Sequence, residues 1–220
     1  MRRLLGSSLA LLLVACGGPS PSPGGPTATE SADAASPGAS SEGDDVAELP
    51  APGGEIPPGT YTRSAFAPRV TFELGPGWTA RQLAAGFFDV EQDAGSVDVI
   101  AVQFGQVVGH DRAQAAATAI AENVNLVVQS GPEEVALGGN SGIQVTVDTV
   151  DPPDTQPPVF RQVVSVAAGP LSIASGRRLQ LTFVDTDAGL LAVLVGGSIR
   201  NWDATLEAVT PVLDSLTIEG

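Results

Sequence analysis

The chain has 220 residues, a single cysteine and a formal net charge of −15 at pH 7. It contains no lysine, and with one cysteine no intramolecular disulfide can form. So acidic a chain lacks the clustered positive charge that nucleic acids and anionic membrane surfaces require, and both are excluded as binding partners of its folded part.

The first fifteen residues have the composition of a secretory signal peptide. Arg2 and Arg3 form a short positive region, and a mostly apolar run follows from Leu4 to Ala15. This run is shorter than the roughly 20 apolar residues that a membrane-spanning helix needs. Its size and its flanks are those of an export signal. We therefore predict that residues 1–15 are a signal peptide.

The end of this run, Leu13-Val14-Ala15-Cys16-Gly17, resembles the bacterial lipobox. The resemblance implies that the Cys16 thiol receives a diacylglycerol, that the chain is cut before Cys16, and that the new amine takes a fatty acid such as palmitate. Two chains anchor a protein stably, whereas one gives marginal binding. The sequence thus predicts an exported lipoprotein on the extracytoplasmic face of a bacterial membrane. The alternatives are an ordinary signal peptide with an incidental cysteine and a buried N-terminal helix of a cytosolic protein.

Residues 16–55 differ sharply in composition from what precedes them. From Gly17 onward Gly, Pro, Ser and Ala dominate, with no aromatic residue, seven acidic residues and no basic one. Such a segment cannot bury enough apolar surface to offset its ordering entropy, so it is predicted to be disordered. As a flexible coil, its 39 residues from Gly17 to Glu55 would span roughly 35 Å. We interpret residues 16–55 as a lipidated tether.

Residues 56–220 are predicted to form a single globular domain, because they suffice for one sizeable core. Apolar and polar residues alternate at 70–74, 143–148 and 179–183, which predicts strands with one buried face. Further strands are expected at 59–63, 86–92, 97–104, 158–167 and 190–195. Turns are marked by glycine, proline and aspartate at 75–77, 93–95 and 185–189.

Two segments are predicted to be helices. Asp111 is expected to cap an alanine-rich run from Arg112 to Glu122. A second helix is expected after Asn201 as its N-cap, with Pro211 causing a kink or a break. Its apolar face should pack on the sheet and comprises Trp202, Leu206, Val209 and Leu213. Mostly antiparallel strands with two helices packed on them make the predicted fold class an α+β sandwich.

Several short blocks together resemble a known group of proteins. They are Gly59-Thr60-Tyr61, Val70-Thr71-Phe72, Gly77-Trp78, Gly86-Phe87-Phe88, the segments 123–128 and 138–143, and Val212-Leu213-Asp214-Ser215-Leu216. These blocks resemble bacterial lipoproteins of unknown function, and their order is similar to PsbP-like domains, including the mycobacterial LpqN-like lipoproteins. The resemblance covers most of residues 56–220. It implies a compact α/β/α-type sandwich and a binding or accessory role, and it carries over no catalytic residue.

No recognised catalytic constellation is present in the sequence. Lysine is absent, the one cysteine is expected to carry lipid, and His110 is the only histidine. A Ser/His/Asp triad would have to use His110, which we interpret instead as an exposed loop residue. The segment Gly138–Gly142 lacks the spacing of a nucleophile elbow and is predicted to be a turn. Carboxylates are numerous, so a carboxylate-based hydrolase stays open as an alternative.

Metal binding is not predicted, and no cofactor is expected. A zinc site needs three or four His, Cys or carboxylate ligands, and the chain offers one histidine. Asp185-x-Asp187-x-Gly189 resembles the start of a calcium loop but lacks the distal glutamate, and a hairpin turn also explains it. A second group of aspartates flanks a proline-rich loop and comprises Asp148, Asp151 and Asp154. A weak calcium site at Asp185 and Asp187 stays open.

The remaining candidates are two arginines and two tryptophans. Arg177 and Arg178 have the donors to hold an anion, although their place at the start of a strand also fits exposure to water. Trp78 and Trp202 are predicted to be core anchors. The sequence therefore favours a non-enzymatic, monomeric envelope lipoprotein whose domain binds an unidentified protein or small molecule. The alternatives are a structural or assembly accessory without a ligand, and the hydrolase named above.

Overall fold

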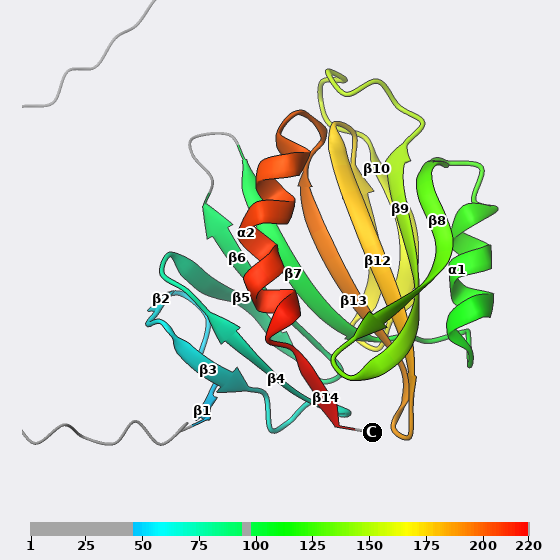
Figure 1. Ribbon diagram of the computed structural model, residues 1–220. Coiled ribbons are helices and arrows are strands. Elements are labelled where there is room, and N and C mark those ends of the chain that lie inside the picture. Colours follow the sequence, from blue (N-terminus) through cyan, green and yellow to red (C-terminus); the bar gives the residue numbers. More distant parts are fainter. Residues whose placement is uncertain (1–45, 94–97, 220) are drawn as a thin grey trace, which may run out of the picture. The chain divides into compact units, whose positions relative to one another are not determined.

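The computed structural model describes residues 46–93 and 98–219 (Figure 1). The signal peptide, the lipobox cysteine Cys16 and most of the tether lie outside the described residues. The described residues form one compact unit. Neither helix within the described ranges has the length and apolar character that crossing a bilayer requires.

The centre of the domain is an eight-stranded antiparallel sheet in the order β2-β5-β6-β7-β13-β12-β9-β8. Its strands are β2 (Glu55–Ile56), β5 (Trp78–Ala84), β6 (Phe87–Asp93), β7 (Val99–Gln106), β8 (Leu126–Leu137), β9 (Asn140–Thr149), β12 (Arg177–Thr186) and β13 (Gly189–Ser198). β13 is a nearly continuous apolar run because both of its faces are buried: Leu191 and Val193 enter one core, and Leu190 and Leu194 enter the other.

One face of this sheet is covered by α2 (Trp202–Asp214) and by a second sheet in the order β1-β3-β4-β14 (Figure 1). Its strands are β1 (Ala47–Glu48), β3 (Gly59–Thr62), β4 (Arg69–Leu74) and β14 (Thr217–Glu219), and only β1 pairs in parallel, with β3. Phe88 and Phe104 stack with their ring centroids 4.5 Å apart, and Phe72 from the second sheet stacks on both. This aromatic stack joins the two sheets into one core.

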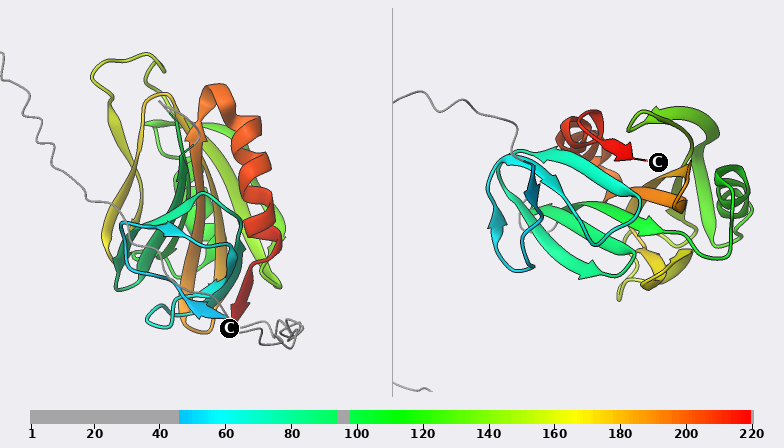
Figure 2. Two further views of the ribbon diagram at one scale, coloured as in Figure 1. Left: turned by 90° about the vertical axis from the view of Figure 1, so that its left-hand side faces the viewer. Right: turned by 90° about the horizontal axis from the view of Figure 1, so that it is seen from below.

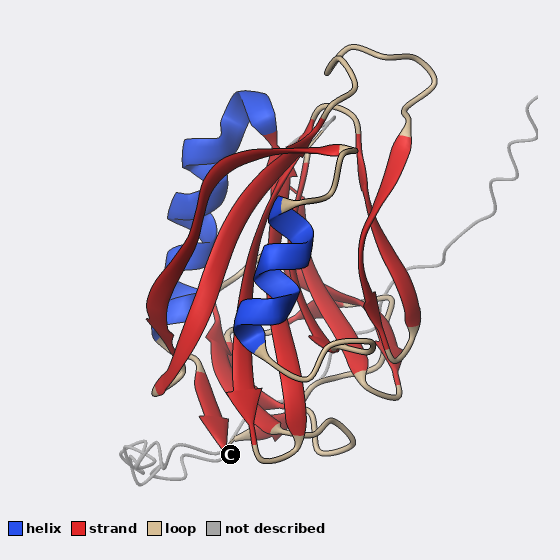
Figure 3. Ribbon diagram, turned by 90° about the vertical axis from the view of Figure 1, so that its right-hand side faces the viewer, coloured by secondary structure: helices blue, strands red, loops and turns tan. Residues whose placement is uncertain are grey.

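The opposite face is covered by α1 (Ala113–Ala121) and by a hairpin of β10 (Phe160–Val166) and β11 (Gly169–Ala174) (Figures 2 and 3). α1 contacts β8, β9 and β12, and its small residues Ala113, Ala116 and Ala117 are buried there. The hairpin buries Val163, Val164 and Ile173 in the same core. The two faces therefore have separate cores, with β12 and β13 between them.

This architecture confirms the predicted α+β class, a mostly antiparallel sheet with two helices packed on it. Each predicted strand and helix has a counterpart, but β5, β8 and β11 and the short strands β1, β2 and β14 were not predicted. β8 is an edge strand whose residues are exposed at almost every position, so its sequence has no alternation to detect. Trp78, at the start of β5, is buried in the core.

The folded part begins earlier than the predicted tether boundary. Within residues 46–55, β1 pairs with β3, the Glu48 carboxylate pairs with Arg63 at 3.0 Å, and Leu49 is only 2% exposed. The composition of this segment predicted disorder because its apolar residues are few. Composition carries no information on the contacts that those residues make. Burial of one leucine in the core and pairing with the edge of β3 are enough to order residues 46–55 of the predicted tether, 16–55.

The predicted cap of α1 is wrong. Asp111 is exposed, and the first turn is capped instead by Asp185, whose Oδ1 accepts a hydrogen bond of 3.0 Å from the backbone N–H of Ala113. Asp185 lies at the end of β12, so the capping carboxylate comes from a strand that the helix packs against. Local sequence shows only the neighbours of a helix terminus, which is why this cap was missed.

α2 begins after Asn201 as predicted, but without the expected side-chain cap and without a break at Pro211. Asn201 holds the N-cap position, but its side chain makes no capping bond and donates instead to Asp98 Oδ2 at 3.1 Å. A turn of 3-10 helix, Ile199–Asn201, precedes α2. The helix continues past Pro211 to Asp214, so the break does not occur. Burial of Val209 on the sheet holds the turn around the proline in place.

Candidate binding pocket

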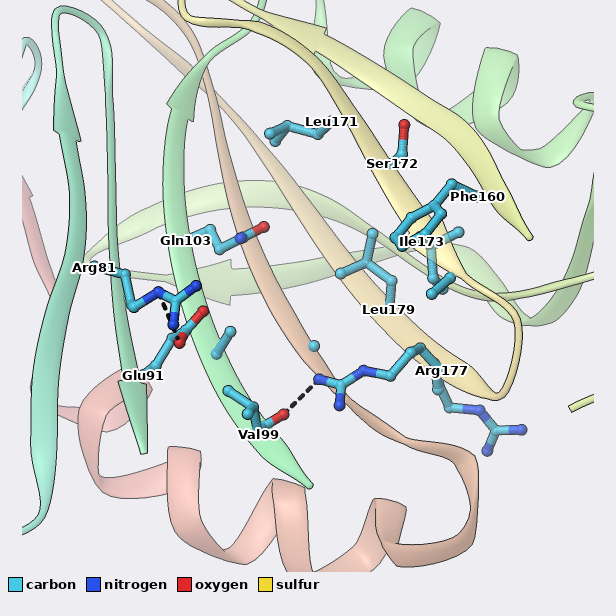
Figure 4. Close-up of a pocket in the computed structure, with 14 residues that line it drawn as sticks. Arg81, Glu91, Val99, Gln103, Phe160, Leu171, Ser172, Ile173, Arg177 and Leu179 are labelled. Atoms are coloured by element: carbon cyan, nitrogen blue, oxygen red, sulfur yellow. Dashed lines mark hydrogen bonds and ion pairs between the residues drawn. The ribbon is translucent and has the colours of Figure 1, made fainter. Parts of the chain in front are cut away.

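A cavity of about 360 Å³ lies between the β10–β11 hairpin and the part of the main sheet formed by β6, β7, β12 and β13 (Figure 4). The sheet leaves this space unfilled at Ala101 and Gly196. They are cross-strand partners, and one has a small side chain and the other has none. We call this cavity the hairpin pocket. Its volume falls within the range of small-molecule sites.

One wall of the hairpin pocket is apolar. It is formed by Leu171 and Ile173 of the hairpin and by Leu179 of β12, with Phe160 at the start of β10 (Figure 4). Phe160 is 67% exposed, the second highest exposure among the large apolar side chains of the described residues. An aromatic ring so exposed beside a cavity is a surface that a bound molecule could cover.

The facing wall is polar. Arg81 Nε and Glu91 Oε2 are 3.3 Å apart, and the side chain of Gln103 projects from β7 toward the space (Figure 4). Arg177 Nη1 donates to Asp98 Oδ1 at 3.1 Å, and its other terminal nitrogen donates to the carbonyl of Val99. These groups come together because Glu91 and Gln103 lie on neighbouring antiparallel strands and share one face of the sheet.

Burial changes the proton affinity of the groups on this wall. Desolvation raises the pKa of Glu91, against the opposing effect of Arg81. Desolvation also raises the pKa of Asp89, which is 5% exposed, although it accepts a 2.6 Å hydrogen bond from the backbone N–H of Gln82 and another from the Gln103 side chain. Glu91 is the one carboxylate among the described residues that line the pocket, and Asp89, which is bonded to Gln103, does not line it.

The three aspartates around the proline-rich loop do not converge. Asp148 accepts two hydrogen bonds of 2.8 Å from Arg178, Asp151 accepts bonds of 2.7 and 2.8 Å from Arg161, and Asp154 pairs with Arg200. Each carboxylate therefore has its own arginine. Among residues 46–93 and 98–219 there is no group of three His, Cys, Asp or Glu side chains placed to hold a metal ion.

The other calcium candidate is occupied by structural contacts. Asp185 caps α1, and Asp187 is exposed in the turn between β12 and β13. The Thr186 hydroxyl donates to the carbonyl of Gly189 at 2.7 Å and closes this turn. His110 lies exposed in the loop between β7 and α1.

Arg177 and Arg178 cannot hold one anion together. Both residues contribute to the lining of the hairpin pocket, but adjacent residues of a strand point to opposite faces. Arg177 therefore extends into the pocket, whereas the Arg178 guanidinium lies on the α2 face, bonded to Asp148. There the Arg178 guanidinium lies 5.8 Å from the ring centre of Trp202, which is half-buried and packed against the core. Each guanidinium thus serves a different site.

Sequence reasoning missed the polar wall of the hairpin pocket. Its signal was present in β6, where Asp89 and Glu91 alternate with Phe88 and Val90, placing two carboxylates on one face of a predicted strand. Arg81 lies on β5, which was not predicted. Nothing local in the sequence tells that a hairpin from residues 160–174 covers this face.

Comparisons with known proteins give distant likenesses of fold. No protein-family model matches the sequence, and no curated protein matches it. The chain is similar to the solution structure of PsbP (CyanoP) from the cyanobacterium Synechocystis sp. PCC 6803, with a TM-score of 0.42 and 11% identity over 68% of this chain and 86% of that one. It is also similar to LpqN of Mycobacterium tuberculosis, a protein involved in cell envelope biogenesis, with a TM-score of 0.40 and 10% identity over 76% and 90%.

A third similar structure comes from Bacteroides thetaiotaomicron, with a TM-score of 0.36 and 9% identity over 69% of this chain and 45% of that one. The resemblance drawn from the sequence is therefore supported only as a distant similarity of fold. At these identities and TM-scores the likenesses assign the chain to no family.

Proposed function

We propose that the domain binds a small molecule in the hairpin pocket and performs no chemistry on it, while a lipid on Cys16 anchors the chain to the extracytoplasmic face of a bacterial membrane. The observation that carries the proposal is the pocket itself. An apolar wall formed by Leu171 and Ile173 faces a polar wall formed by Arg81, Glu91 and Gln103. Such a concave, mostly apolar cavity with a few converging polar groups is typical of ligand sites.

The two alternatives have less support. An accessory protein without a ligand has no need of a cavity of this size or of an exposed aromatic ring at Phe160 beside it. Glycoside hydrolysis by carboxylates needs a pair on either side of the reacting bond. Glu91 lines the pocket and Asp89 is held behind it by Gln82 and Gln103, so this pair does not flank a cleft.

The proposal is tested by isolating the full chain from its own envelope and analysing what it carries. A protease site introduced between residues 17 and 41 would release the domain from the membrane without detergent. Native mass spectrometry of the released domain should then show a stoichiometric organic molecule. The variant Gly196→Phe should lose that molecule, because a Cβ at Gly196 meets only Leu179 at 3.6 Å and a larger side chain would extend into the pocket.

Gly54→Phe is the matched control, since Gly54 is exposed, lies away from the pocket, and has no neighbouring atom within 4 Å of the place that a Cβ would take. Both variants must keep the wild-type melting behaviour. A wild-type domain without a bound molecule, and with the same binding profile as Gly196→Phe against a small-molecule library, would favour the accessory role instead.

A further inference from the structure

We infer that the hairpin pocket selects an uncharged amphiphile, with an apolar body against the hairpin and a hydroxyl- or amide-bearing head against Glu91 and Gln103. This inference rests on the proposed function and names its ligand class. The arginines of the pocket are already paired with acceptors of the protein. Arg81 is held by Glu91, and Arg177 by Asp98 and the carbonyl of Val99. Arg178, which also contributes to the lining, is paired with Asp148, so each arginine of the pocket already has a carboxylate.

An anionic ligand would have to compete for those guanidiniums. Detaching Arg177 would leave the Asp98 carboxylate without its cationic partner and with only the neutral Asn201 amide bonded to it, and the Asp98 side chain is 6% exposed. Leaving a buried charge without its partner is strongly unfavourable. Asp89 behind the polar wall and the net charge of −15 over the whole chain add further repulsion for an anion.

A cationic ligand meets the opposite difficulty. Among the described residues that line the pocket, the one carboxylate that could bind a cation is Glu91. This carboxylate interacts electrostatically with both Arg81 and Arg177. A cation that displaced Arg81 from Glu91 would bring a third positive charge close to two guanidiniums in a partly desolvated space. Like charges at short range in such surroundings repel strongly.

An uncharged head avoids both costs. A carboxylate has about four lone-pair sites and a guanidinium five N–H donors, so Glu91 and Arg81 can hydrogen-bond hydroxyl groups without giving up each other. Gln103 and Ser172 add further polar groups to the lining. The apolar body would contact Leu171, Ile173 and Leu179 and would cover Phe160, and burial of this surface supplies the main driving force.

The test uses three probes with one alkyl chain and different heads: octyl β-D-glucoside, octanoate and octylammonium, each below its micelle concentration at pH 7. Residues 17–220, which keep the tether but lack the signal peptide and the lipidated cysteine, require no detergent. Calorimetry should show octyl glucoside binding at least about tenfold more tightly than either ion, a difference of about 1.4 kcal/mol. Binding should be lost in Gly196→Phe.

Two variants release the paired charges one at a time. Glu91→Gln frees Arg81 and should strengthen octanoate binding several-fold, whereas octyl glucoside, whose head loses a carboxylate acceptor, should bind more weakly. Arg81→Gln frees Glu91 and should strengthen octylammonium binding in the same way; the Arg81 side chain is 66% exposed, so its loss should not unfold the domain. Melting curves check both variants.

The outcomes separate this inference from the proposed function. Octanoate or octylammonium binding as tightly as octyl glucoside, and lost in Gly196→Phe, would overturn the ligand class while leaving a ligand pocket in place. If no probe bound in a way that depends on Gly196→Phe, both the uncharged amphiphile and the pocket as its site would be rejected.

Discussion

Gly196 and Gly197 are neighbours on β13 that meet opposite requirements. A Cβ at Gly197 would lie 2.2 Å from Thr205 Oγ1 and 2.9 Å from Thr205 Cβ, whereas a Cβ at Gly196 would meet only Leu179, at 3.6 Å. Gly197 lets α2 lie close on the sheet, and Gly196 leaves room in the hairpin pocket. The same residue type in two successive positions thus permits close packing on one face and an open space on the other.

This relationship predicts different effects for the two alanine variants. Gly197→Ala should lower the free energy of unfolding by about 1–3 kcal/mol, since the buried Thr205 cannot move without shifting α2. Gly196→Ala should change it by less than about 0.5 kcal/mol. Urea titration of both variants measures the difference. Equal effects would show that α2 does not depend on the missing side chain.

Capping of α1 by Asp185 gives the second prediction. Asp185→Ala should cost about 1 kcal/mol of stability, because the N–H of Ala113 loses its acceptor. Asp111→Ala and Asp187→Ala are the controls, and each should change stability by less than about 0.5 kcal/mol. Hydrogen exchange should locate the loss in the first turn of α1. A larger effect of Asp111→Ala would restore the cap that the local sequence predicts.

The third prediction concerns the residue at which the folded part begins. A chain beginning at residue 57 should be less stable than one beginning at residue 46 by roughly 3–6 kcal/mol, since it loses the buried side chains of Leu49 and Ile56. It also loses the pairing of β1 with β3. Denaturant unfolding of both fragments makes the comparison. Indistinguishable midpoints would return residues 46–55 to the tether.

Burial of Asp89 predicts a specific pH dependence. Its pKa is raised in the folded state, so the folded state holds this proton more tightly than the unfolded one. The stabilisation is complete below the unfolded pKa of about 3.9 and is lost as the pH rises through the folded pKa. Asp89→Asn, which cannot ionise, should therefore be more stable than the wild type at pH 7 and equal to it near pH 3.

The measurement is the free energy of unfolding of both proteins from pH 3 to pH 8. Exposed Asp187→Asn serves as the control and should follow the wild type throughout. A constant difference between Asp89→Asn and the wild type across this range would mean that ionisation of Asp89 is not its cause.

The lipid anchor gives the last prediction. Cys16→Ser should leave an unprocessed precursor and abolish metabolic labelling with a radioactive fatty acid, because serine offers no thiol for the diacylglycerol. The domain itself should fold unchanged, since Cys16 precedes the compact unit of the described residues. A labelled and cleaved Cys16→Ser protein would refute the lipoprotein assignment.

The sequence by itself determined the α+β class, most of the strands and both helices. Period-two alternation in 70–74 and 143–148, and helical spacing around Val209, are local consequences of burying one face of an element. These patterns need no knowledge of the partner. They fail where burial is absent, which is why the exposed edge strand β8 was missed.

Only the tertiary structure decided which polar side chains come together and where the pocket lies. The cap from Asp185, the separate faces of Arg177 and Arg178, and the order of residues 46–55 all depend on contacts between distant segments. The hairpin pocket exists because one hairpin lies over Gly196 and leaves the space above it unfilled. The periodicity of apolar residues indicates that one face of an element is buried, but not which segment covers that face. Strand order and register are set by the packing of the whole domain.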